Sequence, residues 1–188
     1  MPLIPVLTTP LGDGRVALRP AAERDIPDVL VAHDQDPRLY SDRGLKRPPT
    51  GAELGREIEA APELRAAGTF ETLTILEGDS DECRGQIYVY DIDWDHARAA
   101  VGVWLAPGAR GRGLASGALR LAARWLFDEW QLERIELTTL PGNEAMIRAA
   151  RACGFTEEGV LRERERERGR RLDIMILSLL PGDGPKAR

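Results

Sequence analysis

A glycine-rich turn between a β-rich run and a long amphipathic segment constrains the fold of this chain more than any other feature. The run 99–105 ends before Pro107, which has no N–H group and cannot continue a β-ladder. A helix is predicted to begin near Leu114, and the turn before it contains Gly111 and Gly113. Glycines let the backbone approach a ligand closely, and free N–H groups at a helix N-terminus attract anions. The turn therefore indicates either a pyrophosphate site or an ordinary connection.

The residues around this turn distinguish it from the common nucleotide-binding loops. No Gly-Lys-Ser/Thr sequence follows it, and no Gly-x-Gly-x-x-Gly follows the first predicted strand. Arg110 and Arg112 would add positive charge around bound phosphates, and would be solvated in an ordinary connection. The pattern argues against binding of nucleoside triphosphates and dinucleotides.

Hydrophobic periodicity predicts the elements that precede the turn. A first strand is expected over 14–20, followed by a helix that Asp25 caps and that runs to about Asp34. A second helix should open at the capping box Thr50–Glu53, and Pro62 should end or kink it. Three runs of strand length with short polar connections then predict an antiparallel meander: 70–76, 85–90 and 99–105.

The elements after the turn alternate between helix and strand. A helix is expected over 114–130, a strand over 134–139, and a helix that begins at Asn143 and ends at Gly154. This order predicts a crossover unit within the sheet. The last part of the chain predicts strands again.

The segment 162–168 alternates Arg and Glu and fits either a helix or a strand. Its apolar flank before residue 162 and the turn at Gly169 favour a hairpin with 172–179. We interpret the alternation as a solvated face of this hairpin, or as part of a dimer surface.

Length and charge limit the organisation and the partners. The chain has 188 residues and a formal net charge of −5. Its length suits one domain over 13–181 between tails at 1–12 and 182–188. The acidic balance argues against nucleic acid as a partner, because phosphate binding requires a dense basic face. No apolar run approaches the ~20 residues of a membrane span, and the proline-broken N-terminus does not resemble a secretion signal.

Cysteine and histidine usage argues against a metal site. Cys83 and Cys153 lie far apart, and His33 and His96 are the only histidines. This set makes neither a disulfide scaffold nor a clustered metal site. We therefore expect a reduced, cytoplasmic protein without a metal ion.

In its order of elements, its turn and the asparagine that opens the next helix, the chain resembles the GNAT acetyltransferase superfamily. The family motif Arg/Gln-x-x-Gly-x-Gly/Ala is matched by Arg110, Gly113 and Ala115. The resemblance covers about residues 13–181. Four segments are similar to the ribosomal-protein N-acetyltransferase branch: 15–20, 101–107, 143–155, and 159–162 with the Gly169 and Asp173 that follow.

The resemblance implies an α+β fold with a mixed, mostly antiparallel seven-stranded sheet. This sheet would be splayed between its fourth and fifth strands and flanked by about four helices. Acetyl-CoA would bind in the V between these strands as the acyl donor. In the implied reaction, a neutral primary amine attacks the thioester directly. The amine would belong to a small molecule or to a protein N-terminus.

The same resemblance assigns residues to the donor. Backbone groups of three strand residues would pair with the pantetheine arm and polarise the thioester: Val103, Trp104 and Leu105. Next to Arg110, the N–H groups of the turn would hold the pyrophosphate: Gly111, Arg112, Gly113, Leu114, Ala115 and Ser116. The side chain of Asn143 would bond to the pantetheine arm, or act as a helix cap, or do both.

The sequence departs from the family at its usual acid and base positions. These positions hold residues that cannot transfer a proton: Ala100, Met146 and Ala150. Four other residues are candidate bases, each of which also fits a role as surface charge: Glu136, Asp91, Asp93 and His96.

The departures leave alternatives open. A GNAT-like module that binds acyl-CoA as a sensor would need no acid or base, and a structural assembly partner would need no CoA at all. Neither the acceptor nor the oligomeric state, monomer or homodimer, follows from the sequence. Protein N-terminal amines, polyamines, aminoglycosides and amino-acid-like amines all suit an acidic cleft. Acetyl rather than succinyl is the family default for the acyl group.

Overall fold

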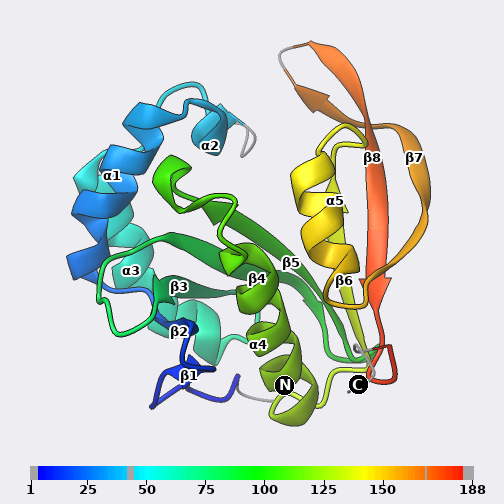
Figure 1. The fold of residues 1–188 in the computed structure, drawn as a ribbon, viewed down its shortest axis with the longest axis horizontal. Coiled ribbons are helices and arrows are strands. Elements are labelled where there is room, and N and C mark those ends of the chain that lie inside the picture. Colours follow the sequence, from blue (N-terminus) through cyan, green and yellow to red (C-terminus); the bar gives the residue numbers. More distant parts are fainter. Residues whose placement is uncertain (1–3, 42–44, 168, 184–188) are drawn as a thin grey trace.

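The computed structural model describes residues 4–41, 45–167 and 169–183, and its centre is one mixed β-sheet (Figure 1). The sheet has eight strands in the order β1-β2-β3-β4-β5-β6-β8-β7, and all neighbours are antiparallel except β5 and β6. The strands are β1 (Leu11–Gly12), β2 (Val16–Pro20), β3 (Glu71–Glu77), β4 (Gly85–Asp93), β5 (Arg98–Leu105), β6 (Arg134–Thr139), β7 (Thr156–Glu167) and β8 (Arg170–Leu179). The helices are α1 (Ile26–Gln35), α2 (Arg38–Ser41), α3 (Gly51–Ala66), α4 (Leu114–Asp128) and α5 (Glu144–Arg151).

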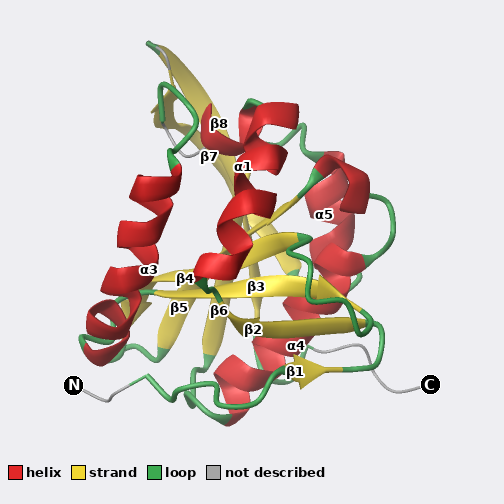
Figure 2. Ribbon diagram, turned by 90° about the vertical axis from the view of Figure 1, so that its left-hand side faces the viewer, coloured by secondary structure: helices red, strands yellow, loops and turns green. Residues whose placement is uncertain are grey.

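Helices cover both faces of the sheet. Figure 2 shows α1 and α3 on one side of β2–β4 and α4 on the other. The apolar stripe of α4 packs on the apolar face of the sheet and closes the main core. Fully buried side chains of this core come from five strands and α4: Leu18, Ile75, Ile87, Leu119, Leu137 and Leu177. Within the described part of the chain, no helix has the length and apolarity needed to cross a membrane.

The sheet opens between its two parallel strands. β5 pairs with β6 only where Arg98–Val101 lie beside Arg134–Leu137. Beyond Val101, β5 stays paired with β4 as far as Leu105, so its other edge faces a gap. The strands expected as the fourth and fifth, over 99–105 and 134–139, are β5 and β6 of the structure. The expected splay between them is therefore confirmed, as is the α+β fold.

Two counts differ from the sequence-based expectation. The sheet has eight strands rather than seven, because Leu11 and Gly12 pair with Leu18 and Ala17. This pairing is only two residues long, too short to produce an alternating pattern. Ile4 is also buried in the core, so part of the stretch expected to form a tail packs against the sheet. The fifth helix is the four-residue α2, which is too short to show helical periodicity.

The capping box of α3 is confirmed, and of the two outcomes expected at Pro62, an end or a kink of the helix, the end is wrong. The Thr50 hydroxyl accepts a hydrogen bond from the Glu53 N–H at 3.3 Å, and the Glu53 carboxylate accepts one from the Thr50 N–H at 2.8 Å. The helix continues through Pro62 to Ala66. Pro62 is exposed, so the carbonyl that it leaves without a helical donor can bond to water instead.

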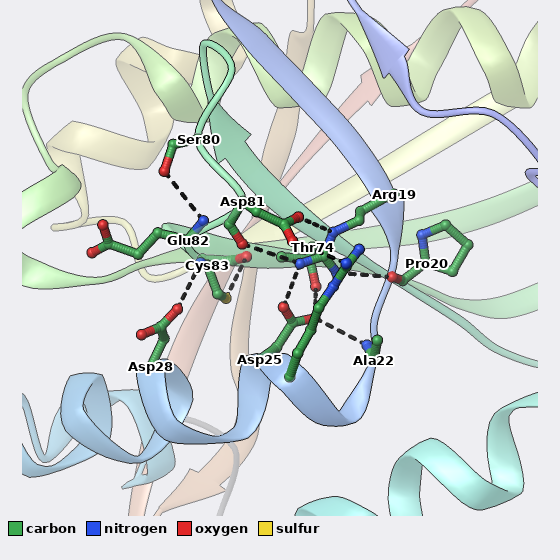
Figure 3. A network of polar contacts seen from close by, with 12 residues as sticks. Arg19, Pro20, Ala22, Asp25, Asp28, Thr74, Ser80, Asp81, Glu82 and Cys83 are labelled. Carbon is green, nitrogen blue, oxygen red and sulfur yellow. Dashed lines mark hydrogen bonds and ion pairs between the residues drawn. The ribbon is translucent and has the colours of Figure 1, made fainter.

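A buried ion pair joins β2 to the start of α1 (Figure 3). The Arg19 guanidinium donates to both Asp25 carboxylate oxygens, at 2.6 and 2.9 Å. Asp25 also accepts from the Thr74 hydroxyl at 2.6 Å and from the Ala22 N–H at 2.9 Å. On its other side, Arg19 donates to the Asp81 carboxylate at 3.2 Å. The network therefore fixes β2, β3, α1 and the β3–β4 connection relative to one another.

Candidate active site

A cavity of about 550 Å³ lies where β5 and β6 separate. β5 contributes Gly102, Val103 and Trp104 to its lining, and α5 and its cap contribute Asn143 and Met146. β4, β6, α2 and the β7–β8 hairpin complete the lining. The gap in the sheet is therefore a real cavity that reaches from the helix α5 to the hairpin.

The start of α4 has the geometry of an anion site. Gly111 and Gly113 adopt positive φ values of 73° and 77°, a region that favours glycine. The first helical hydrogen bond runs from the Gly117 N–H to the Gly113 carbonyl at 3.0 Å. The N–H groups of residues 111–116 have no hydrogen-bond acceptor among the described residues. A pyrophosphate would supply the acceptors that these groups lack.

Three arginines surround this turn, and ion pairs engage two of them. Arg110 pairs with Asp36 at 2.7 Å and donates to the Leu105 carbonyl at 3.1 Å. Hydrogen bonds from Arg38 and then from Arg110 hold the pKa of the Asp36 carboxyl well below its usual value. The turn is thereby tied to the end of β5 and to the region that follows α1.

The other two arginines meet at the start of α4. Arg112 pairs with Glu77 at 2.7 Å, and its carbonyl accepts from the Arg15 guanidinium at 2.6 Å. The same guanidinium lies 3.5 Å from the position that a Cβ atom would take on Gly113. Sequence reasoning missed Arg15 because 97 residues separate it from Arg112.

Asn143 caps α5 and also lines the cavity. Its Oδ1 accepts from the Met146 N–H at 3.2 Å, and its Nδ2 donates to the Thr139 hydroxyl at 3.0 Å. The cap is thus present, and the role toward a pantetheine arm stays a prediction. Val103, Trp104 and Asn143 are brought together around the cavity, whereas Leu105 and residues 110–116 lie outside its lining.

The structure places the four candidate bases outside the cavity lining. Glu136 is engaged by Arg134 at 2.7 Å and by Arg98 at 3.7 Å. Asp93 is held by His96 at 3.0 Å, and hydrogen bonds from that residue keep the pKa of Asp93 below its usual value. A lowered pKa makes a carboxylate a weaker base. This geometry therefore does not support Glu136 or Asp93 as the general base.

Two tyrosines that sequence reasoning missed flank the point where the sheet opens. A Cβ atom on Gly102 would lie 3.5 Å from the Tyr90 ring and 3.9 Å from the Tyr88 ring. The Tyr88 hydroxyl accepts from the Trp104 indole N–H at 2.9 Å and donates to Gln86 at 3.0 Å. Burial raises the pKa of Tyr90, which keeps its hydroxyl protonated. The alternation of strands places Tyr88 and Tyr90 on one face, but only the register brings them to Gly102.

Neither cysteine should react in the native protein. Burial raises the pKa of Cys83 to about 12 and that of Cys153 to about 11. At pH 8, a thiol with a pKa of about 11 is ionised in only about one molecule in a thousand. Titration with Ellman's reagent should show almost no reaction before unfolding and two thiols per chain afterwards. Rapid reaction of a native thiol would contradict this expectation.

A mixed sheet that opens between its parallel strands, with a helix N-terminus beyond one of them, defines the fold and site of an N-acetyltransferase. The acetyltransferase (GNAT) domain family matches residues 15–156. The N-acetyltransferase p20 of Bacillus licheniformis, itself uncharacterised, is 30% identical over 167 residues, which are 88% of this chain and 93% of p20. The chain belongs to the GNAT acetyltransferase family, and its relatives place it in the RimJ-like branch.

Solved structures of similar fold have been determined with acetyl-CoA or with CoA-disulfide. RimJ of Mycobacterium smegmatis in complex with CoA-disulfide is 25% identical, with a TM-score of 0.77 over 95% of this chain and 89% of RimJ. The microcin C7 self-immunity acetyltransferase MccE, in complex with acetyl-CoA and AMP, is 21% identical. The two structures superpose over 92% of this chain and 97% of the MccE chain, with a TM-score of 0.79.

Proposed function

We propose that this N-acetyltransferase takes its acetyl group from acetyl-CoA and transfers it to a primary amine. The observation that carries the proposal is the gap between β5 and β6, whose cavity lies beside the free edge of β5. The N–H groups of residues 111–116 lie beyond the end of that strand and fit a pyrophosphate. The CoA-disulfide ligand of RimJ and the acetyl-CoA ligand of MccE support the same donor.

The chemistry of the reaction is acyl transfer. The lone pair of a neutral amine attacks the thioester carbonyl carbon, the C–S bond breaks, and the nitrogen loses a proton while the sulfur gains one. Bound acetyl-CoA supplies the activated acyl group. The protein would hold the donor along Val103–Leu105 and Asn143, and would position the amine at the opening of the sheet.

Tyr90 can supply the proton that the departing CoA thiolate needs. The residues at the family's usual acid positions, Met146 and Ala150, cannot supply it. Met146 lines the cavity but has no acidic proton, and Ala150 is fully buried in the core. Tyr90 lines the same cavity, and its phenol carries a proton at neutral pH. A hydroxyl at this place can protonate the departing thiolate.

The second candidate function is a sensor that binds acyl-CoA without turnover. It is favoured by the absence of proton-transferring side chains at Ala100, Met146 and Ala150. In either case the two free, buried thiols suit a reducing compartment, and we propose that the protein acts in the cytoplasm.

Two measurements on the wild-type protein test both candidates. We expect acetyl-CoA to raise the melting temperature in a dose-dependent way, because a ligand that binds only the folded state stabilises it. We also expect release of CoA thiol when amines are added, with little background from Cys83 and Cys153. Stabilisation without thiol release for any amine would favour the sensor. No stabilisation at millimolar acetyl-CoA would refute both candidates.

A further inference from the structure

The β7–β8 hairpin adds two carboxylates to the lining of the cavity. Glu165 lies opposite Leu172, and Glu167 lies opposite Arg170. Side chains two residues apart on a strand share one face, so both carboxylates project from the same side of β7. Leu172 and Ile174 of β8 line the cavity together with them. This hairpin face therefore belongs to the cavity rather than to the solvated surface alone.

An irregular pairing bends the hairpin at this point. The register between β7 and β8 shifts between Leu161 and Glu165, and Glu163 has a positive φ of 52°. The Asp173 carboxylate accepts from the Glu163 N–H at 2.8 Å, and Arg171 donates to the Glu163 carbonyl at 3.3 Å. Bulges of this kind redirect the side chains that follow them. In Figure 1 the free end of the hairpin leans toward α2.

Aromatic rings lie in the same cavity as the carboxylates. Tyr88, Tyr90 and Trp104 contribute to its lining, and Leu39 of α2 does so from across the gap. Carboxylates and aromatic faces are the groups that bind organic cations.

Arg166 is the cationic residue of the lining. It pairs with Arg171 and projects from the opposite face of β7 to Glu165 and Glu167. Arg170 lies opposite Glu167 but outside the lining, so the lining itself contains two acidic residues and one basic residue.

We propose that Glu165 and Glu167 select acceptors that carry a second cationic group besides the amine that is acetylated. This inference rests on the proposed function, because the acceptor must enter the same cavity as the thioester. The second cation lies at the hairpin, and the reacting amine lies at the opening of the sheet near Gly102. A diamine is the simplest molecule of this class.

The test compares a diamine with a monoamine of the same chain length. The double variant Glu165→Gln/Glu167→Gln removes both charges and keeps the side-chain size. Glu163→Gln is the matched control, because Glu163 lies on the same strand but outside the cavity lining, and its bulge is held through its backbone. The probes are 1,4-diaminobutane and n-butylamine, and the assay is CoA thiol release with acetyl-CoA.

We expect wild type and Glu163→Gln to prefer the diamine in kcat/KM. In the double variant this preference should fall by about three- to tenfold, because Glu165 is exposed and Glu167 is half-buried, and water screens their contacts with a cation. Added salt should weaken the preference in the wild type, where the carboxylates remain, and change it little in the double variant. An unchanged preference in the double variant, or no preference in the wild type, would overturn the inference.

Calorimetric titration of 1,4-diaminobutane into the protein with CoA present provides a readout that needs no turnover. Weaker diamine binding by the double variant than by Glu163→Gln supports the role of Glu165 and Glu167 even when no thiol is released. In that case the proposed catalysis fails and the inference about the cavity stands. Equal binding by the two variants would overturn the inference whether or not the protein is active.

Discussion

Replacement of Gly113 by tryptophan is expected to abolish the stabilisation of the protein by acetyl-CoA. Gly113 precedes α4 with a φ of +77°, next to the N–H groups that we assign to the pyrophosphate. Its Cβ position lies 3.5 Å from the Arg15 guanidinium, so an indole ring would displace Arg15 or cover these groups. At a ligand concentration of one hundred times Kd, the stabilisation lost would be about 2.7 kcal/mol.

The measurement is the shift in melting temperature on addition of acetyl-CoA, taken relative to each unliganded variant. This reference removes the strain that any side chain suffers at a positive φ. Gly169→Trp is the matched control, because Gly169 has a φ of +83° and nothing within 4 Å of its Cβ position. The control should retain the wild-type shift. A full shift in Gly113→Trp would show that the pyrophosphate does not bind at the start of α4.

The substitution Asp25→Asn is expected to lower the free energy of unfolding by about 3–5 kcal/mol. The Asp25 side chain is 2% exposed and that of Arg19 is 5% exposed, so the variant leaves a buried guanidinium without its counterion. The amide also cannot accept all the bonds that Arg19, Thr74 and Ala22 donate to the carboxylate. Denaturation by urea, followed by circular dichroism, measures the loss.

Asp81→Asn is the control for this prediction. Asp81 binds the same arginine, but its side chain is 60% exposed. Exposed ion pairs contribute about 1 kcal/mol or less, so we expect a change of that size. Equal losses in the two variants would show that burial does not determine how much the Arg19–Asp25 pair contributes to the free energy of unfolding.

The pH dependence of stability gives a second test of the same pair. Burial would raise the pKa of Asp25, but hydrogen bonds from Arg19, Thr74 and Ala22 outweigh it and hold the pKa below its usual value. The carboxylate therefore stabilises the folded state above its unfolded pKa, and this contribution is lost as the pH falls through the folded pKa. Acidification should destabilise wild type more steeply than Asp25→Asn.

The sequence predicted correctly those features of the fold that depend on residues close together in the chain. The glycine turn, the capping box of Thr50 and Glu53 and the β7–β8 hairpin depend on contacts within a few residues, and all three are present. The splay between β5 and β6 followed from the family resemblance, since no local pattern specifies where two strands part.

The features that sequence reasoning missed depend on register and on distant contacts. Tyr90 reaches Gly102 only because β4 and β5 pair in one particular register, and a shift of one residue would turn its ring to the other face. Glu165 is exposed, which agrees with the solvated face that the alternation predicted, but its place in the cavity lining was missed because the bend of β7 at Glu163 has no sequence signal. The strand β1 was missed because two residues are too few to show the alternation of apolar and polar residues that marks a strand.

The alternation of Arg and Glu in β7 also affects how copies of the protein meet. β7 lies at the edge of the sheet and exposes almost all of its twelve residues, so its free backbone groups offer a template for another strand. When two copies of one strand pair antiparallel about a twofold axis, each residue faces one an even number of positions away. Arg162–Glu167 would then place arginine against arginine and glutamate against glutamate, which is repulsive. The charge pattern therefore protects this edge from aggregation.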